Sequence, residues 1–253
     1  MKDPIITIQK LSQSFLDEGE NVAALDDVSF SVHRGEFLVV IGPSGCGKST
    51  LLRILAGLQK PEKGSVQFNP SEFKQHHAMV FQSFGIFPWL TVRNNIRFGL
   101  DMRPEIASRH NEHGGQIDSI VDFYLKDLGL ADFADDYPRE LSGGMKQRVG
   151  LARALAVDPE VLLMDEPFSQ LDAFTAKTLR NEVLKTWHRE KMTVIMVTHL
   201  IEEAVELADR ILVMTSRPGK VEAILENTLP RPRNERTPDF WKLEDRLSEI
   251  IKF

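Results

Sequence analysis

The sequence has only one cysteine and lacks any long apolar run. A single thiol cannot form an internal disulfide, so we expect a reducing compartment. No apolar stretch approaches the ~18 residues needed to span a bilayer. The first residues carry no apolar segment of the kind found in secretory signals, and we expect none. Any association with a membrane is therefore expected to come through a partner.

Basic residues are in the minority. The 31 Lys and Arg residues face 37 Asp and Glu residues, which gives a formal net charge of -6. Proteins that bind nucleic acid usually present a basic face, so we expect no nucleic-acid partner. The 253 residues are 42% hydrophobic and 27% charged, which is ordinary for globular proteins and enough for one large or two small domains.

Residues 42–50 fit the phosphate-loop pattern G-x-x-x-x-G-K-[ST]. The apolar run 37–41 before them is typical of a buried parallel strand, and the run 51–56 after them is typical of a helix. Glycines let backbone N–H groups face an anion, and the helix N-terminus adds positive charge. The alternative is a glycine-rich turn that binds nothing. The flanking elements favour a nucleotide site, with Lys48 on the β- and γ-phosphates and the Ser49 hydroxyl on Mg2+. The binding residues are Gly42, Pro43, Ser44, Gly45, Cys46, Gly47, Lys48, Ser49 and Thr50.

Strands and helices alternate from residue 37 onward, which predicts an α/β fold with a mostly parallel core sheet. Residues 28–32 alternate apolar and polar positions, as in a half-exposed antiparallel strand. We expect residues 103–115 to form an exposed loop. Strands are expected at 5–8, 28–32, 37–41, 65–68, 78–81, 161–164, 193–197, 210–214 and 221–225, and helices at 51–56, 94–100, 117–128, 149–156, 172–190, 201–208 and 239–251.

Polar residues follow three of the predicted core strands. Gln82, Asp165–Glu166 and His199 lie where those strands end, and ligands of open α/β sheets bind at that edge. Asp165 is a candidate Mg2+ ligand and Glu166 a candidate general base. Gln82 is a candidate for ligating Mg2+ or positioning water, and His199 for donating to the γ-phosphate. The alternatives are a turn-capping aspartate, a surface glutamate, polar filling and a structural histidine.

Two further positions are candidates for nucleotide contact. Phe15 precedes the phosphate-loop strand and is a candidate for stacking on adenine, although a single Phe is more often a core residue. Ser142 is a good N-cap for the helix that follows. With Gly143 and Gly144 it places a second anion site at a helix N-terminus. That site either binds another ligand or completes the site of a second copy.

Together these motifs resemble the ATP-binding-cassette family over nearly the whole chain. The phosphate loop, Gln82, Leu141-Ser142-Gly143-Gly144, the run Leu162 to Pro167, Ser169-Gln170-Leu171-Asp172 and His199 stand in that family's order. The resemblance implies a phosphate-loop NTPase-like core with an N-terminal antiparallel β subdomain and a helical subdomain carrying the LSGG signature. We expect an ATPase domain over 1–230, its helical subdomain over about 84–158, and a linker with a helix over 231–253.

The resemblance also implies partners. It implies a homodimer, or a dimer with another such ATPase subunit, in which two ATP are sandwiched. Ser142 and Gly144 of one copy then meet the phosphate held by Lys48 of the other, and Asp172 lies at the seam. The Gln82–Trp89 region is expected to receive membrane-spanning permease subunits, and a solute-binding protein joins through the complex. The expected location is the cytoplasmic face of the inner (plasma) membrane, peripherally attached.

Finer features are similar to the ATPases of nitrate, sulfonate, taurine and bicarbonate importers. These are Met145, the run Pro88 to Val92, Asp165-Glu166-Pro167-Phe168, and Ser216-Arg217-Pro218-Gly219. Leu200 and Gln170 depart from the family's usual residues near the dimer seam. We expect no large C-terminal regulatory domain. The alternatives are an exporter or lipid-trafficking ATPase, a cassette ATPase acting on nucleic acid or ribosomes, and a nucleotide-gated module without turnover.

Two further expectations concern the exposure of an aromatic stretch and the reactivity of the cysteine. The aromatic stretch Phe84 to Trp89 is expected to be partly exposed as a partner site, with burial in the core as the alternative. Cys46 lies inside the phosphate loop, so we expect alkylation of its thiol to inhibit and bound ATP to protect.

Overall fold

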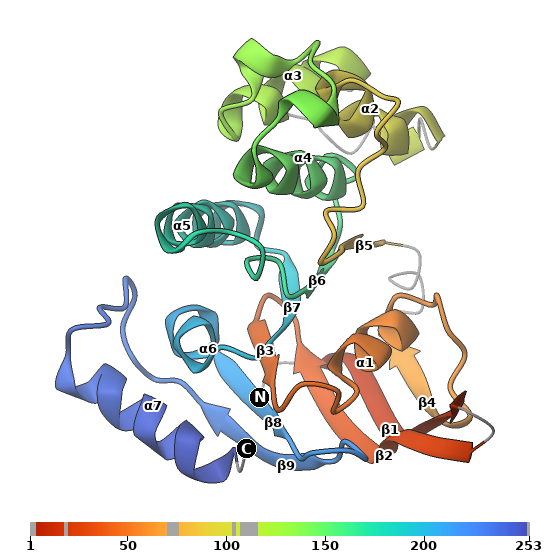
Figure 1. Ribbon diagram of the computed structural model, residues 1–253, viewed down its shortest axis with the longest axis vertical. Helices are drawn as coiled ribbons and strands as arrows, with labels where there is room; N and C mark the ends of the chain where they lie inside the picture. Colours follow the sequence, from red (N-terminus) through yellow and green to blue (C-terminus); the bar gives the residue numbers. More distant parts are fainter. Residues whose placement is uncertain (1–3, 18–19, 70–75, 103–104, 107–115, 252–253) are drawn as a thin grey trace. The chain divides into compact units, whose positions relative to one another are not determined.

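The computed structural model of the protein describes residues 4–17, 20–69, 76–102, 105–106 and 116–251. The chain forms two units: Met1–Gln75 with Lys191–Phe253, and His76–Glu190 (Figure 1). The prediction of an exposed loop at 103–115 falls largely outside the described residues. The described helices include none that is both long and apolar enough to cross a membrane.

The first unit contains parallel strands that end at a shared edge. β3 is buried along its whole length because β7 and β8 pair with it on either side, both parallel to it. Ile41 of β3 lies opposite Thr198 of β7 and Val213 of β8, and β9 runs antiparallel to β8. A separate antiparallel sheet has the order β2-β1-β4. The elements are β1 (Pro4–Asp17), β2 (Glu20–His33), β3 (Phe37–Ile41), α1 (Lys48–Leu55), β4 (Lys63–Phe68), β7 (Thr193–Thr198), α6 (Ile201–Leu207), β8 (Arg210–Met214), β9 (Val221–Glu226) and α7 (Pro238–Ile250).

Strands β1 and β2 extend well beyond the short runs that the sequence predicts for them. Their pairing shifts register between Ile8 and Leu11, and Lys10 has a left-handed φ of 49°. Because of this bulge Ile8 and Leu11 are both buried, which breaks the alternation from which a strand is predicted. The predicted segments were therefore parts of one long hairpin.

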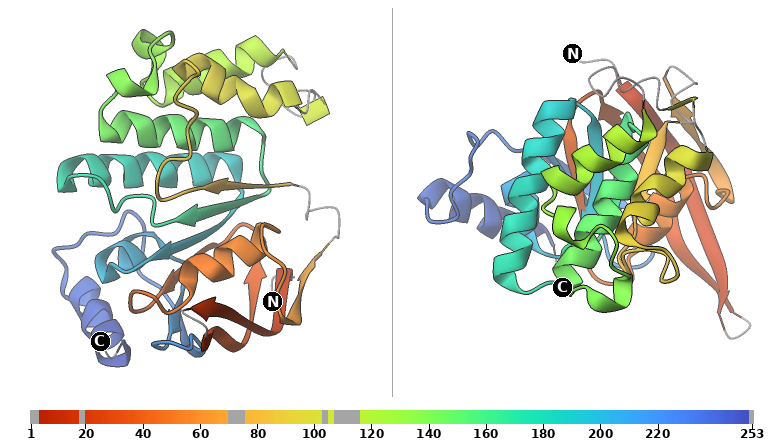
Figure 2. Two further views of the ribbon diagram at one scale, coloured as in Figure 1. Left: turned by 45° about the vertical axis from the view of Figure 1, so that its right-hand side comes forward. Right: turned by 90° about the horizontal axis from the view of Figure 1, so that it is seen from above.

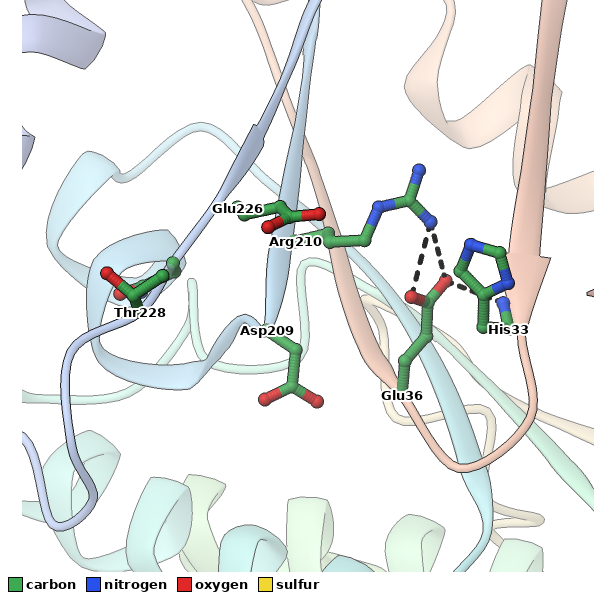
Figure 3. A pocket seen from close by; sticks show the side chains of 7 residues that line it. His33, Glu36, Asp209, Arg210, Glu226 and Thr228 are labelled. Carbon is green, nitrogen blue, oxygen red and sulfur yellow. Dashed lines mark hydrogen bonds and ion pairs between the residues drawn. The ribbon is translucent and has the colours of Figure 1, made fainter. Parts of the chain in front are cut away.

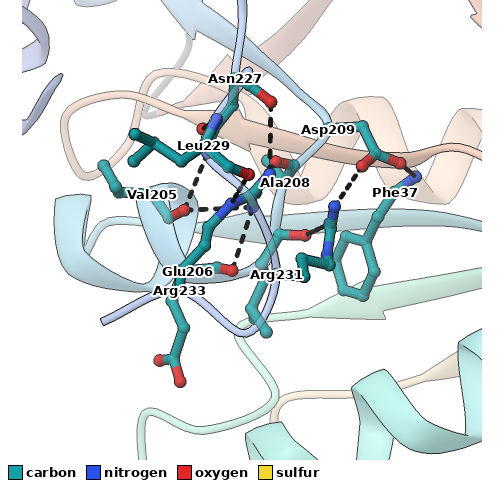
Figure 4. Close-up of polar contacts among 10 residues, drawn as sticks. Phe37, Val205, Glu206, Ala208, Asp209, Asn227, Leu229, Arg231 and Arg233 are labelled. Atoms are coloured by element: carbon teal, nitrogen blue, oxygen red, sulfur yellow. Dashed lines mark hydrogen bonds and ion pairs between the residues drawn. The ribbon is translucent and has the colours of Figure 1, made fainter. Parts of the chain in front are cut away.

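The segment between β9 and α7 is fixed to the end of α6 by two arginines (Figure 4). Arg231 donates to the carbonyl oxygen of Leu207 at 2.5 Å. Burial lowers the pKa of Arg233 to about 10. These cations bond the carbonyl groups that a helix end leaves without intrahelical partners, and they suit its negative dipole end. Arg233 donates to the carbonyl oxygens of Val205, Glu206 and Ala208, at 3.2, 3.0 and 2.6 Å.

The second unit combines two parallel strands with helices (Figure 2). Val80 of β5 lies opposite Met164 of β6, so these strands also end together. Helix α2 packs on α3 and α4. Residues 84–158 lie within this unit, and their separation as a subdomain stays a prediction. The elements are β5 (His77–Val80), α2 (Val92–Met102), α3 (Ile117–Asp127), α4 (Gly143–Ala156), β6 (Val161–Asp165) and α5 (Ala173–Glu190), with short 3-10 turns at Ala131–Phe133 and Pro138–Glu140.

Candidate functional site

The phosphate-loop segment joins β3 to α1, and its glycines are required by close approach. Helix α1 begins at Lys48, and its N-cap Gly47 has a left-handed φ of 99°. A Cβ atom on Gly47 would lie 2.7 Å from the carbonyl oxygen of Ala24. A Cβ atom on Gly42 would lie 2.8 Å from the carbonyl oxygen of Met214. The loop is therefore packed closely from two sides. Ser44 and Gly45 are exposed, and Pro43, Ser49 and Thr50 are half-buried.

The Lys48 ammonium lies inside the loop. It donates to the carbonyl oxygens of Gly42 at 2.7 Å and Pro43 at 2.9 Å, and the residue is only 4% exposed. A buried cation needs such partners because its desolvation is costly. The loop thus carries a fixed positive charge next to a helix N-terminus, which is the chemistry of an anion site.

His199 lies beside the phosphate loop at the shared strand edge. It follows Thr198, which pairs with Ile41, the residue just before the loop. The Thr198 hydroxyl donates to a Glu203 carboxylate oxygen at 2.6 Å and accepts from the Leu200 N–H at 3.1 Å. These bonds fix the turn that carries His199, which is half-buried.

Phe15 lies near the end of the β1–β2 pairing at which Asp17 is opposite Glu20. It pairs in register with Val22 and is 36% exposed, so it is not a core residue. An exposed aromatic ring is suited to stacking, and the adenine contact stays a prediction.

The second unit brings the other strand-end residues together. The Gln82 side-chain N–H donates to a Glu166 carboxylate oxygen at 3.3 Å. Asp165, the last residue of β6, is 5% exposed, whereas Glu166 is half-buried. Gln82 and Glu166 therefore form one polar pair at the edge where β5 and β6 end.

The Ser142-Gly143-Gly144 segment opens helix α4, as the sequence predicts. The Ser142 hydroxyl caps the helix by accepting from the Met145 N–H at 3.3 Å. Ser142 and Gly143 are exposed. A Cβ atom on Gly144 would lie 2.5 Å from the Thr175 methyl carbon, so any larger residue there would have to displace the Thr175 side chain.

Asp172 caps helix α5 beside this segment. One of its carboxylate oxygens accepts from the backbone N–H groups of Phe174 at 3.1 Å and Thr175 at 3.0 Å. Hydrogen bonds from the Thr175 side chain and backbone lower the pKa of Asp172. Thr175 thus contacts both Gly144 and Asp172. Sequence reasoning missed it, although a Thr three residues after an N-cap Asp was the available signal.

The aromatic stretch after Gln82 is held by a buried amide that sequence reasoning also missed. Asn95 is 0% exposed. Its side-chain amide oxygen accepts from the Phe87 N–H at 2.7 Å. Its side-chain NH2 group donates to the backbone carbonyl oxygens of Phe87, Leu90 and Thr91. The Trp89 side chain is 69% exposed. Phe87 is half-buried, and the Arg153 guanidinium lies over its ring. An Asn on the apolar face of a predicted helix was the available signal.

A polar pocket at the opposite ends of the strands does not belong to this site (Figure 3). It has a volume of 530 Å³ and is lined by charged residues where β3 and β8 begin. Arg210 and Glu36 form an ion pair at 3.2 Å, and Asp209 accepts from the Phe37 N–H at 3.0 Å. Because these charges already bond one another and the backbone, we assign the pocket a structural role.

The Cys46 thiol should react slowly. It is 1% exposed, and burial raises its pKa even though the Lys48 ammonium, 3.8 Å away, acts in the other direction. The thiolate is the reactive form, so a raised pKa leaves less of it at pH 8, and reactivity rises as the pH is raised. We expect iodoacetamide to label Cys46 at least tenfold more slowly than the urea-unfolded chain, and ATP to slow labelling further. Rates equal with and without ATP would contradict this.

Comparisons with known proteins give a consistent result. The model of a family described as "ABC transporter" matches residues 25–169. The aliphatic sulfonates import ATP-binding protein SsuB of Bacillus subtilis (strain 168) is 42% identical over 252 residues, which is 98% of this chain and 94% of that protein. The nitrate import ATP-binding protein NrtD of Synechocystis sp. is 40% identical over 259 residues, covering 98% and 95%.

A solved structure is also similar. It is the dimeric structure of a post-hydrolysis state of the ATP-binding cassette MJ0796 bound to ADP and Pi. The TM-score is 0.74 at 29% identity, and the match covers 90% of this chain and 99% of that one. The fold predicted from the sequence, with an antiparallel N-terminal sheet and a mostly parallel core sheet, is confirmed.

Proposed function

Because this chain belongs to the ABC transporter family, in which it is an ATP-hydrolysing subunit, we propose that it powers the uptake of a small solute of the nitrate or sulfonate type. The observation that carries the ATPase role is the buried Lys48 ammonium inside a loop packed on both sides. The importer role is supported by its likeness to SsuB and NrtD, which are import ATPases for aliphatic sulfonates and nitrate.

The residues take the following roles in ATP hydrolysis. Lys48 and the amides of the loop hold the phosphates, and His199, beside the loop, donates to the γ-phosphate. Glu166 acts as the general base toward water. The hydrogen bond from Gln82 positions one of the Glu166 carboxylate oxygens. Phe15 stacks on the adenine ring.

Mg2+ fits this set of donors. Asp165, Gln82 and Ser49 offer a carboxylate, an amide oxygen and a hydroxyl, and Mg2+ prefers oxygen ligands with one or two carboxylates. Because the Gln82 amide nitrogen bonds Glu166, its oxygen is the end left to ligate. Held by these residues, Mg2+ would supply positive charge that neutralises the phosphates.

The active unit is a dimer, formed either by two copies of this chain or by this chain and a similar ATPase subunit. The exposed Ser142-Gly143-Gly144 helix start of one copy closes on the phosphates held by its partner. Asp172 lies at the seam, where its contact with Thr175, a neighbour of Gly144, links the seam to the helix start. The dimeric state of the similar MJ0796 structure supports this arrangement.

The surface around Trp89 receives the membrane-spanning subunits, which place the chain at the cytoplasmic face of the membrane. Replacing Trp89 by alanine should lower co-purification with the membrane-spanning subunits about 30-fold, because a tryptophan that anchors an interface typically contributes about 2 kcal/mol or more. Uptake of nitrate or alkylsulfonate should fall in parallel, while ATP hydrolysis by the isolated chain stays unchanged.

Trp241→Ala is the matched control, since Trp241 is 52% exposed on α7. It should leave co-purification and uptake at the parent's level. Unchanged co-purification of the Trp89 variant would contradict the assigned surface, and uptake of neither solute would contradict the solute class.

A further inference from the structure

The turn between β8 and β9 is tightly built. The Thr215 hydroxyl lies 3.0 Å from the carbonyl oxygens of Ser216 and Pro218 and accepts from the Lys220 N–H at 2.9 Å. The Thr215 N–H also donates to the Lys220 carbonyl oxygen at 3.0 Å. One side chain therefore closes the whole turn.

This turn is fixed to strand β2. The Gly219 N–H donates to the carbonyl oxygen of Ala24 at 2.9 Å, and the Gly219 carbonyl oxygen accepts from the Asp26 N–H at 3.0 Å. The Lys220 ammonium adds an ion pair with Asp26 at 2.8 Å. The backbone pairing means that the turn and β2 move together.

The same turn lies directly against the phosphate loop. A Cβ atom on Gly219 would overlap the carbonyl oxygen of Cys46 and lie 2.6 Å from the Met214 terminal methyl carbon. Gly42 approaches the carbonyl oxygen of Met214, and Gly47 approaches that of Ala24, at which the turn is also fixed. The loop is therefore enclosed by the end of β8, the turn and β2.

Such a loop binds phosphate only while its N–H groups face inward, and holding them so before binding lowers the entropic cost of binding. We propose that residues 214–220 form a brace that holds the phosphate loop in its anion-binding conformation, with Gly219 as a positioning residue for the nucleotide. Gly219 touches the loop backbone and not the nucleotide. This inference rests on the proposed nucleotide site.

The test uses Gly219→Ala with Ser216→Ala as the control in the same turn. The added methyl group must displace the Cys46 carbonyl, so we expect the ATP dissociation constant and KM to rise at least tenfold while kcat changes less than twofold. Cys46 is the only cysteine, so thiol labelling reports on this loop alone. In nucleotide-free protein, labelling should become at least tenfold faster in Gly219→Ala and stay unchanged in Ser216→Ala.

A second variant keeps the test decisive if Gly219→Ala does not fold. Thr215→Val opens the turn without adding bulk. It should raise the ATP KM and the labelling rate at least about fivefold, because the hydroxyl loses both the hydrogen bond that it donates and the one that it accepts. A folded variant of either kind with the parent's KM and labelling rate overturns the brace. A fall in thermal stability and kcat alone, with KM and labelling unchanged, also overturns it. If the parent chain itself binds no ATP, the proposed function fails instead, while the labelling comparison still decides the brace.

Discussion

Replacing Glu166 by glutamine is expected to lower steady-state ATP hydrolysis by about two to four orders of magnitude, the usual contribution of a positioned general base. Glutamine has the same shape but cannot take a proton from water. ATP binding should persist, because in the proposed site the loop, and not Glu166, holds the phosphates. In the proposed mechanism hydrolysis reopens the pair of copies, so the variant should accumulate as an ATP-bound dimer.

The geometry around Glu166 makes this the residue to replace. Its φ is 43°, a left-handed conformation that costs a non-glycine residue about 1–3 kcal/mol. The conformation is held because the Glu166 carbonyl oxygen accepts from the Ser169 hydroxyl at 2.9 Å and the Ser169 N–H at 3.3 Å. Gln82 directs the carboxylate from the other side. Strained backbone maintained by specific bonds is typical of functional positions.

Glu160→Gln is the matched control, because it makes the same change just before β6, at the opposite end of the strand from Glu166. It should hydrolyse ATP at the parent's rate. The measurements are phosphate release under saturating Mg-ATP and the elution volume in size-exclusion chromatography with and without ATP. Hydrolysis by the Glu166 variant at the parent's rate would show that another group activates water. If hydrolysis falls as expected but no ATP-dependent dimer forms, the proposed site shared between two copies is contradicted instead.

The parts of the site that follow from local chemistry could be predicted. The β-branched run before Gly42 predicts a buried strand, and Ser142 has a side chain that helix N-termini favour. Parallel strands end at a common edge, which predicts that Gln82, Glu166 and His199 lie at strand ends on a ligand-binding edge. That Gln82 bonds Glu166 and that His199 lies beside the phosphate loop depends on the strand order, which the structure provides. These predictions need only a few consecutive residues and one rule of sheet topology.

The remaining parts depend on contacts between distant segments. The apolar face of its helix indicates that Asn95 is buried, but the sequence does not show that its partner is the backbone of the loop before it. Gly219 belongs to a sequence motif that resembles those of one importer subgroup. Its close approach to the Cys46 backbone, however, arises only because β8 pairs with β3 in the fold. Burial of the Cys46 thiol likewise arises from packing, which is why its slow reaction is an expectation of the structure and not of the motif.

Replacing Lys48 by alanine is expected to weaken ATP binding by about 10- to 150-fold, since hydrogen bonds to charged groups contribute about 1.5–3 kcal/mol. The Lys48 ammonium is already positioned by the carbonyl oxygens of Gly42 and Pro43. In the parent, the entropic cost of ordering this side chain on phosphate binding is therefore small. The loss should be confined to nucleotides with β- and γ-phosphates. Affinity for AMP should be unchanged, because AMP offers no phosphate that Lys48 reaches.

Lys48→Met separates charge from packing, because methionine keeps most of the buried stem and lacks the ammonium. Both variants should lose ATP affinity to the same extent in equilibrium titrations, and both should melt cooperatively. If methionine retains the affinity that alanine loses, the stem supports the loop by packing and the ammonium is not the phosphate contact. If both bind ATP as the parent does, the anion site does not lie in this loop. A loss shared with AMP would mean that the substitution deforms the loop itself, since only a deformed loop can weaken a ligand that the ammonium never touches.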